Sequence, residues 1–257
     1  MFKKLSRSVE GLVTIITGAS SGMGKATAEV FADAGANVIA TDIDNHNLKK
    51  VVENIKRNKG TCEGYILDVT KKDDIDKVID KIIEHHSQID ILINNAGVAF
   101  PTTFEDEDYE EKWAFTLDVL LTGQMRVIKA SLPYILKSSC PRIVNISSTE
   151  GFGATPMHSP YTSAKHGVIG LTRSLAVELG SKGVTVNCIC PGPINTNMTS
   201  NIDQSSKEKY AKRRVPLSRY GEPQEVAHAT LNLCLPSSSF INGAILPVDG
   251  GLSIKRA

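Results

Sequence analysis

A glycine-rich turn between a hydrophobic strand and a helix constrains the fold of this chain more than any other feature. The apolar run 12–16 leads into Thr17-Gly18-Ala19-Ser20-Ser21-Gly22-Met23-Gly24, and a helix-forming segment, 25–32, follows. This order places backbone N–H groups and a helix N-terminus where a pyrophosphate can lie, and the glycines allow close approach. A glycine-rich loop by itself can also be a simple tight turn. Its position after the first strand favours a dinucleotide-binding loop in an α/β fold.

Hydrophobic runs alternate with amphipathic helical segments along the chain. We expect strands near residues 12–16, 37–41, 63–67, 89–93, 142–146, 184–189 and 244–248. We expect helices near 22–34, 45–58, 71–86, 107–137, 160–181 and 223–234. Helix starts are indicated by Thr70 with Asp73 three residues later, and by Pro223 in a first turn. The alternation predicts a parallel sheet with helices on both faces and ligands beyond the carboxyl ends of its strands.

No Pro/Gly/Ser-rich linker divides the 257 residues, so we expect one domain, 1–257, with a doubly wound Rossmann fold and a seven-stranded parallel sheet. The 29 basic and 28 acidic residues give a net charge of +1, which argues against binding to nucleic acid or a membrane surface. No segment is typical of a signal peptide or a membrane span, and a cytoplasmic protein is expected.

The cysteines and histidines show no pattern typical of a metal site. The five cysteines have no C-x-x-C spacing, and no histidines are paired as in H-E-x-x-H, so we expect no bound metal. Buried free thiols are the favoured interpretation. We expect Cys188 and Cys190, which flank Ile189, to face opposite sides of the sheet.

Tyr161 and Lys165 form the pattern of a proton-transfer site. On a helix, residues four apart lie on the same face, and a nearby cation lowers the pKa of a phenol. Such a pair also arises by chance on helix surfaces, where it contributes a few tenths of a kcal/mol. Ser148 stands thirteen residues before Tyr161 and supplies a hydroxyl group that can bind a substrate oxygen.

Other motifs follow in order: Asn94-Asn95-Ala96-Gly97, Pro191-Gly192 and the closing Val248-Asp249-Gly250-Gly251. Together with the TGxxxGxG spacing from Thr17 to Gly24, and with Ser148 and Tyr161/Lys165, they resemble the short-chain dehydrogenase/reductase superfamily. The resemblance covers nearly the whole chain. It implies an alcohol dehydrogenase or ketone reductase acting on CH–OH groups, with 3-oxoacyl reductases, polyol dehydrogenases and hydroxysteroid dehydrogenases among similar proteins. Enoyl reduction is disfavoured, because relatives with that activity space the tyrosine and lysine further apart.

The resemblance assigns catalytic roles to Ser148, Tyr161 and Lys165. Tyr161 would transfer the hydroxyl proton as general acid or base, and Ser148 would bind the substrate oxygen. Lys165 would bind the nicotinamide ribose and lower the pKa of Tyr161. Bringing a phenol from about 10 toward 7 requires roughly 4 kcal/mol, and Lys165 together with the positive charge of the oxidised nicotinamide is the expected source. We prefer Ser148 to Ser147 because of the family spacing.

The cofactor is expected to be NAD (NADH). Asp42 ends the second expected strand, where a carboxylate can bind both adenosine ribose hydroxyls and repel a 2′-phosphate. Neither Ser21 nor Ile43 supplies an arginine for that phosphate. The alternative is that Asp42 only caps the next helix. The resemblance implies cofactor contacts at Thr17, Gly18, Ser20, Ser21, Gly22, Met23, Gly24, Asp42, Ile43, Asp68, Val69, Asn95, Ala96, Gly97, Tyr161, Lys165, Pro191, Gly192, Ile194 and Thr196.

Leu120 departs from the family pattern. Residues 118–123 read D-V-L-L-T-G, where relatives have D-V-N-L-T-G, and the missing asparagine supports a helix kink and a water link to the lysine. A leucine side chain cannot bind that water, and Thr116 or a backbone carbonyl is a candidate substitute. The alternative function is therefore an NAD(H)-binding sensor with impaired catalysis. We expect Leu120→Asn to preserve folding and raise turnover.

The substrate is a small alcohol or ketone whose identity the sequence does not specify. By family position, pocket candidates are Ala99, Phe100, Ser148, Glu150, Phe152, His158, Pro193 and Met198. Residues 195–220 form a lid in relatives, and here they are rich in lysine and arginine. An anionic substrate or carrier and a solvated helix face both fit this composition. The resemblance also implies a homotetramer, with helices 107–137 and 160–181 in a dimer interface.

Overall fold

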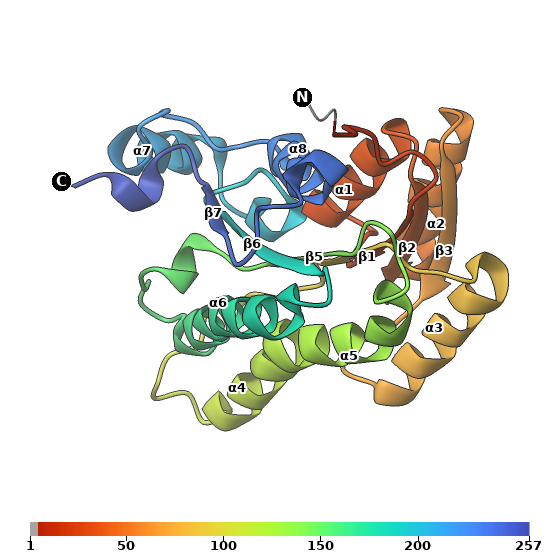
Figure 1. The fold of residues 1–257 in the computed structure, drawn as a ribbon. Coiled ribbons are helices and arrows are strands. Elements are labelled where there is room, and N and C mark those ends of the chain that lie inside the picture. The colour runs from red at the N-terminus through yellow and green to blue at the C-terminus, as the bar shows by residue number, and fades with distance from the viewer. Residues whose placement is uncertain (1–4, 257) are drawn as a thin grey trace.

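A seven-stranded parallel sheet forms the centre of the protein (Figure 1), in a computed structural model that describes residues 5–256. The strand order is β3-β2-β1-β4-β5-β6-β7, so the order reverses between β1 and β4. The prediction of a doubly wound sheet with seven strands is confirmed. The strands are β1 (Val13–Thr17), β2 (Asn37–Asp42), β3 (Thr61–Ile66), β4 (Ile91–Asn94), β5 (Arg142–Ile146), β6 (Thr185–Pro191) and β7 (Ile245–Val248).

Helices cover both faces of the sheet. In Figure 1, α1 and α8 lie on one side and α3, α4, α5 and α6 on the other. α2 packs on the α1 side, where its Leu48 and Val51 share a buried cluster with Phe31 of α1. The bounds are α1 (Gly22–Asp33), α2 (Asn45–Arg57), α3 (Lys72–His86), α4 (Tyr109–Leu117), α5 (Gly123–Ile135), α6 (Ser159–Gly180), α7 (Gln204–Arg214) and α8 (Pro223–Cys234).

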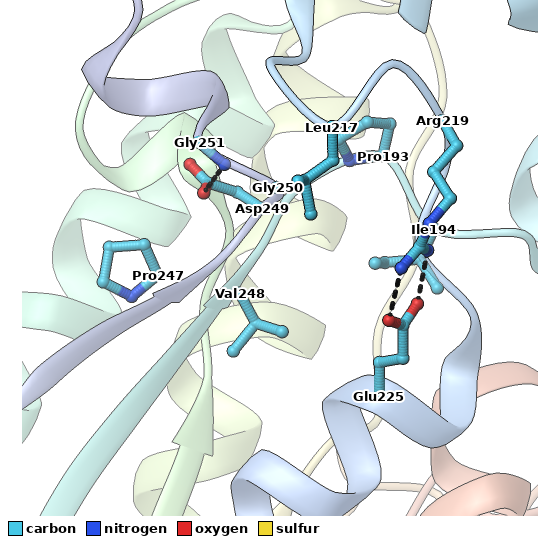
Figure 2. Close-up of a pocket in the computed structure, with 11 residues that line it drawn as sticks. Pro193, Ile194, Leu217, Arg219, Glu225, Pro247, Val248, Asp249, Gly250 and Gly251 are labelled. Carbon is cyan, nitrogen blue, oxygen red and sulfur yellow. Dashed lines mark hydrogen bonds and ion pairs between the residues drawn. The ribbon is translucent and has the colours of Figure 1, made fainter.

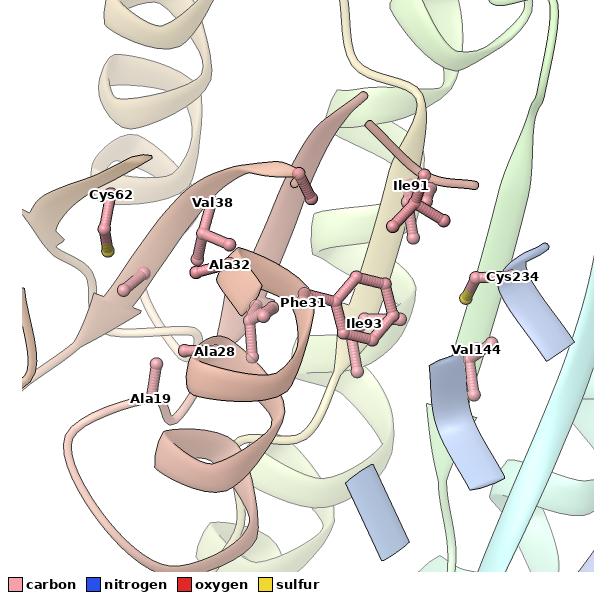
Figure 3. Packing of buried hydrophobic residues seen from close by; sticks show 14 of the residues in the cluster. Ala19, Ala28, Phe31, Ala32, Val38, Cys62, Ile91, Ile93, Val144 and Cys234 are labelled. Carbon is pink, nitrogen blue, oxygen red and sulfur yellow. The ribbon is translucent and has the colours of Figure 1, made fainter. Parts of the chain in front are cut away.

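Both faces of the central strands are buried, as expected for a parallel sheet between two helix layers. Ile16 belongs to the cluster beneath α1, and the adjacent Ile15 belongs to the cluster beneath α3 and α5. Figure 3 shows Phe31 of α1 pointing toward Ile93 of β4. This packing explains why the strands read as continuous apolar runs rather than alternating ones.

The helix 107–137 is interrupted, and one helix was not predicted. Asp118–Thr122 forms a π-helical turn between α4 and α5, in which the Gly123 N–H donates to the Asp118 carbonyl. α7 lies within residues 195–220, where its polar and charged sequence gives little periodicity for a prediction. The start of α8 at Pro223 is confirmed, and Glu222 and Glu225 form its capping box.

Two local predictions are wrong. α3 begins after Lys71 rather than Thr70, because the Thr70 hydroxyl and N–H both donate to Asp68 Oδ1 instead, at 2.7 and 3.0 Å. Cys188 and Cys190 share one face of β6, with their sulfurs 3.9 Å apart and packed near Val168 and Ile169 of α6. Side chains alternate along a strand, so residues two apart lie on the same side. The prediction of buried free thiols is confirmed for all five cysteines.

Candidate functional site

The candidate site lies at the carboxyl ends of β1, β4, β5 and β6, around the point where the strand order reverses. The glycine-rich turn connects β1 to α1, and Asn94 ends β4 and is followed by residues 95–97. The Thr17 hydroxyl accepts from the N–H groups of Asn95 and Ala96, at 3.0 Å each. The Asn95 amide donates to the carbonyls of Thr17 and Gly18, at 3.0 and 3.1 Å. Asn95 and Ala96 therefore hold the glycine-rich turn in shape.

The glycines of this turn are required by the space around them. A Cβ at Gly24 would lie 2.0 Å from the Gly18 carbonyl oxygen and 2.4 Å from Asn95 Nδ2. Gly18 has φ +66° and Gly22 has φ +52°, conformations that favour glycine. Ser21 is the N-cap of α1 and, among the described residues, its side chain accepts no capping bond. The first N–H groups of α1 thus suit an anion, and the residues present fit a dinucleotide.

Asp42 ends β2 and connects two structural elements. Its Oδ2 accepts from the Ser20 N–H at 3.0 Å, and its Oδ1 accepts from the Asp44 N–H at 2.9 Å. The cap of α2 is Asp44, whose Oδ1 accepts from the Asn47 N–H at 3.1 Å. The alternative that Asp42 only caps the next helix is therefore wrong. Its neighbour Ile43, which directly follows β2, is 70% exposed.

The remaining predicted cofactor residues also lie at or after the carboxyl ends of the strands, and they differ in burial and in the protein groups to which they bond. The Asp68 Oδ1 accepts a hydrogen bond from Thr70. Val69 is buried beside Gly123, where a Cβ added to the glycine would lie 3.0 Å from Val69 Cγ2. Pro191 ends β6, and the Gly192 N–H donates to the Val248 carbonyl at 3.0 Å. Ile194 is buried, and Thr196 caps a short helical turn. Thr196 also lies close to Gly22, since a Cβ added to this glycine would be 3.3 Å from the Thr196 Cβ. The segment after β6 therefore reaches the glycine-rich turn.

Ser148, Tyr161 and Lys165 are brought together where β5 ends and α6 begins. Ser148 caps the helical turn Thr149–Gly151, and its Oγ accepts from the Glu150 N–H at 3.1 Å. Lys165 is buried; its ammonium donates to the Ile146 carbonyl at 2.9 Å and lies 5.3 Å from the centre of the Tyr161 ring. The Ser147 hydroxyl instead donates to the Lys165 carbonyl at 2.8 Å. Ser147 is thus occupied in fixing α6 to β5, and Ser148 has a hydroxyl proton left to donate.

The pKa values of Tyr161 and Lys165 shift because both groups are buried. Burial raises the pKa of Tyr161 to about 12, and the Ser148 side chain acts in the opposite direction. Burial lowers the pKa of Lys165 to about 8. The lowering of the Tyr161 pKa expected from Lys165 and the oxidised nicotinamide concerns the cofactor-bound protein and stays a prediction. The phenol holds its proton, which suits it to act as an acid.

The side chain of Leu120 is fully buried in the π-helical turn, in the apolar cluster that contains Val119 and Val127. The break in the helix is present without the family asparagine. Thr116, the proposed substitute, is buried at 3% exposure. Leu120 is thus a core residue, and this position changes the expectation for its replacement.

We now expect Leu120→Asn to lower the free energy of unfolding by about 2–4 kcal/mol, because an amide replaces an apolar side chain in a packed core. Urea unfolding of the two proteins measures this difference. Leu5→Asn, the same exchange at a leucine that is 43% exposed and lies outside the helices α4, α5 and α6, is the control and should change stability little. Equal stability of Leu120→Asn and the wild type would contradict the packing argument.

The pocket candidates surround the catalytic group unevenly. Glu150 accepts from the Thr155 N–H and the Thr162 hydroxyl, at 2.9 and 2.8 Å, and so fixes the loop before α6. The His158 ring stands edge-on to Tyr161, with 6.3 Å between ring centres. Phe152 and Met198 are 44% and 53% exposed, and Phe100 stacks on Phe115. Ala99, between Val98 and Phe100, is partly buried.

Figure 2 shows the residues that line a cavity of about 480 Å³. It is lined by Pro193 and Ile194, by the end of the 195–220 segment, and by the turn after β7. Arg219 closes one side through two bonds of 2.7 Å to Glu225. Ser148, Tyr161 and Lys165 do not line it, so we assign the chemistry to the carboxyl-end edge of the sheet where these three residues meet.

Sequence reasoning missed one polar residue near Lys165. Gln124 of α5 is 4% exposed, and its amide Nε2 lies 3.4 Å from the Ile146 carbonyl that binds Lys165. The available signal was a polar residue one turn before Val127 and Ile128, on the buried side of an amphipathic helix.

Comparison with known proteins agrees with this geometry. The model of a family described as "Enoyl-(Acyl carrier protein) reductase" matches residues 18–253. The chain is 39% identical to the 3-oxoacyl-(acyl-carrier-protein) reductase FabG of Thermotoga maritima, over 96% of this chain and 99% of that protein. It is 36% identical to the (2S)-((R)-hydroxy(phenyl)methyl)succinyl-CoA dehydrogenase subunit BbsD of Thauera aromatica, over 96% and 98%.

A solved structure shares the fold closely. The crystal structure of a putative gluconate dehydrogenase from Agrobacterium tumefaciens superposes with a TM-score of 0.93, at 30% identity, over 98% of this chain and all of that one. Among residues 5–256, no helix has the length and apolar character needed to cross a membrane. The ordered motifs, the fold and these relatives show that the chain belongs to the short-chain dehydrogenase/reductase superfamily.

Proposed function

We propose that the protein is an NAD-dependent ketone reductase that also catalyses the reverse oxidation of a secondary alcohol. The observation that carries this proposal is the convergence of Ser148, Tyr161 and Lys165 beside the glycine-rich turn, at the reversal point of the sheet. The relatives support reduction of a carbonyl, since several are named 3-oxoacyl reductases. The Tyr161-to-Lys165 spacing disfavours enoyl reduction, and no observation favours a sensor without catalysis.

The residues divide the work of the reaction between them. The glycine-rich turn and residues 191–196 would hold a nicotinamide cofactor, which would supply the hydride when bound. Ser148 Oγ, which accepts from Glu150 N–H, keeps its proton and donates a hydrogen bond to the substrate oxygen. Tyr161 gives its phenolic proton to that oxygen as negative charge develops there. Lys165, fixed by the Ile146 carbonyl, brings a positive charge near the phenolate that remains.

For the substrate, we propose a 3-oxoacyl thioester. The Thermotoga maritima relative is named for such a substrate, and the Thauera aromatica relative for a hydroxyacyl-CoA. The test is the rate of reduced-nicotinamide consumption with acetoacetyl-CoA, compared with polyol-derived ketones and 3-oxosteroids. A marked preference for acetoacetyl-CoA supports the proposal. Turnover of a polyol-derived ketone or a steroid, but not of the thioester, would contradict the proposed substrate class and would still support ketone reduction as the reaction.

The preference for NAD is proposed from Asp42. Asp42→Asn keeps an oxygen to accept from the Ser20 N–H, but removes the charge that would repel a 2′-phosphate. We expect the ratio of kcat/KM for NADH to that for NADPH to fall by at least about tenfold, through the loss of charge-assisted bonds to the ribose. Asp44→Asn, beside it at the α2 cap, is the matched control. An unchanged ratio in Asp42→Asn would contradict the assignment.

We also propose that residues 195–220 cover the substrate and that the protein is a homotetramer. A bridge between Ile194 and Gly221 joins the residues that flank this segment, and α7 lies within it. The proposed dimer interface of α4, α5 and α6 carries exposed apolar side chains at Phe115, Met125 and Val177, of which Val177 is 85% exposed. Such side chains suit burial against a second copy.

A further inference from the structure

Gln124 is a buried polar residue whose amide nitrogen has a hydrogen-bond partner and whose amide oxygen has none among the described residues. Its Nε2 donates to the Ile146 carbonyl at 3.4 Å, whereas its Oε1 is buried and has no hydrogen-bond partner among the described residues. The opposite amide orientation would place Oε1 against the carbonyl oxygen, so the donor must face Ile146. A buried acceptor left unpaired costs free energy, and such groups commonly bind an ordered water.

The Ile146 carbonyl is shared between Gln124 and Lys165. It accepts from the Lys165 ammonium at 2.9 Å as well as from the Gln124 amide. A carbonyl oxygen has two lone pairs, so it can serve both donors. Gln124 and Lys165 are therefore linked through a single shared acceptor, the Ile146 carbonyl oxygen.

A second unpaired acceptor lies on the same side of the sheet. Asn94 Oδ1, at the end of β4, is buried without a partner among the described residues, while its Nδ2 donates to Asn145 Oδ1 at 2.9 Å. Asn145 in turn donates to Thr172 of α6, which places this pair on the face that α5 and α6 cover. A buried water needs several polar partners, and this region supplies more than one.

We propose that Gln124 is a positioning residue of the catalytic apparatus, which fixes the Ile146 carbonyl through its amide and holds a buried water beside Lys165 through its free Oε1. Gln124 would thereby supply the polar side chain that Leu120 cannot provide. It acts through Lys165 and does not touch the substrate. The inference rests on the proposed function, since it takes Lys165 as catalytic.

The variant that tests this is Gln124→Met, which keeps the side-chain length and removes both polar ends. The matched control is Ser131→Ala, because the Ser131 hydroxyl is also buried and unpaired among the described residues but lies two helical turns further along α5. We expect kcat of Gln124→Met to fall about tenfold through the loss of a bond that supports a charged group. The Kd for NADH and the Tm should change little, and Ser131→Ala should retain the wild-type kcat.

Two further measurements separate positioning from a structural role. A crystal structure of the cofactor-free protein should show an ordered water bonded to Gln124 Oε1, lost in Gln124→Met. The solvent deuterium isotope effect on kcat should be larger in Gln124→Met than in the wild type, because proton transfer becomes slower. The inference would be overturned by an unchanged kcat in Gln124→Met, or by a crystal structure with no ordered water bonded to Gln124 Oε1. It would also be overturned if the fall in kcat were matched by a lower Tm and weaker NADH binding.

Failure of the proposed function is distinguishable from failure of this inference. If wild-type turnover does not depend on Tyr161, the catalytic assignment itself is wrong, whatever Gln124 does. If turnover depends on Tyr161 but not on Gln124, only the role of Gln124 is withdrawn. The water at Oε1 is observed without turnover and tests the structural half of the inference directly.

Discussion

Tyr161→Phe is expected to reduce kcat by about 10²–10⁴-fold, the range attributed to general acid–base catalysis. The substitution removes one oxygen and leaves the ring, which packs in the cluster beneath α5 and α6. Folding and NADH binding should therefore be preserved. The measurement is steady-state absorbance of the reduced nicotinamide, with NADH binding followed by calorimetry.

Tyr134→Phe on α5 is the matched control, since it removes a phenolic oxygen from the same cluster and should retain the wild-type kcat. A kcat of Tyr161→Phe within a few-fold of the wild type would exclude the phenol as the proton donor. Burial raises the pKa of Tyr161, so the phenolate needed for alcohol oxidation becomes more abundant as pH rises. The oxidation rate should therefore increase with pH, whereas ketone reduction, which uses the neutral phenol, should not.

Gly24→Ala is expected to abolish detectable NADH binding and to lower the free energy of unfolding by about 2–4 kcal/mol. A Cβ at this position would lie 2.0 Å from the Gly18 carbonyl oxygen, and a backbone atom cannot move aside without displacing the turn. The displaced turn would also lose the bonds from Asn95 to Thr17 and Gly18. Calorimetric titration with NADH and urea unfolding measure the two effects.

Gly170→Ala on α6 is the control for this prediction. A Cβ at Gly170 meets nothing within 4 Å, so the exchange should stabilise the helix by about 0.5–1 kcal/mol. NADH binding should be unchanged in this variant. Wild-type NADH affinity in Gly24→Ala would show that the turn does not hold the cofactor.

The fold was predictable because its signals are local. The run of Ile15 and Ile16, followed by the glycine-rich turn and α1, repeats a pattern of strand, turn and helix that has few stable arrangements. The predictions failed where local signals competed. At Thr70 the sequence shows a helix-capping pattern, but in the structure the Thr70 hydroxyl bonds to Asp68 instead of capping the helix. The helix α7 was missed because its sequence is almost uniformly polar.

The candidate site was predictable as a set of residues but not as a set of contacts. The sequence indicated that Ser148, Tyr161 and Lys165 belong together, since spacing along a helix and order along the chain are properties of the sequence itself. The sequence placed a cation near Tyr161 but did not reveal the burial that raises the pKa of Tyr161 in the cofactor-free protein. The size of this shift depends on burial among α6, the loop before it and the end of β5, which is a property of the packed molecule.

The sequence by itself determined the alternation of strands and helices, the glycine-rich turn and the identity of the residues available for proton transfer. Only the tertiary structure decided that Asp42 connects β2 to the turn, that Leu120 is a core residue and that Gln124 shares the Ile146 carbonyl with Lys165. The physical reason is that hydrogen bonds and burial depend on residues distant in the chain, such as Gln124 and Ile146, which become neighbours when the helices pack on the sheet.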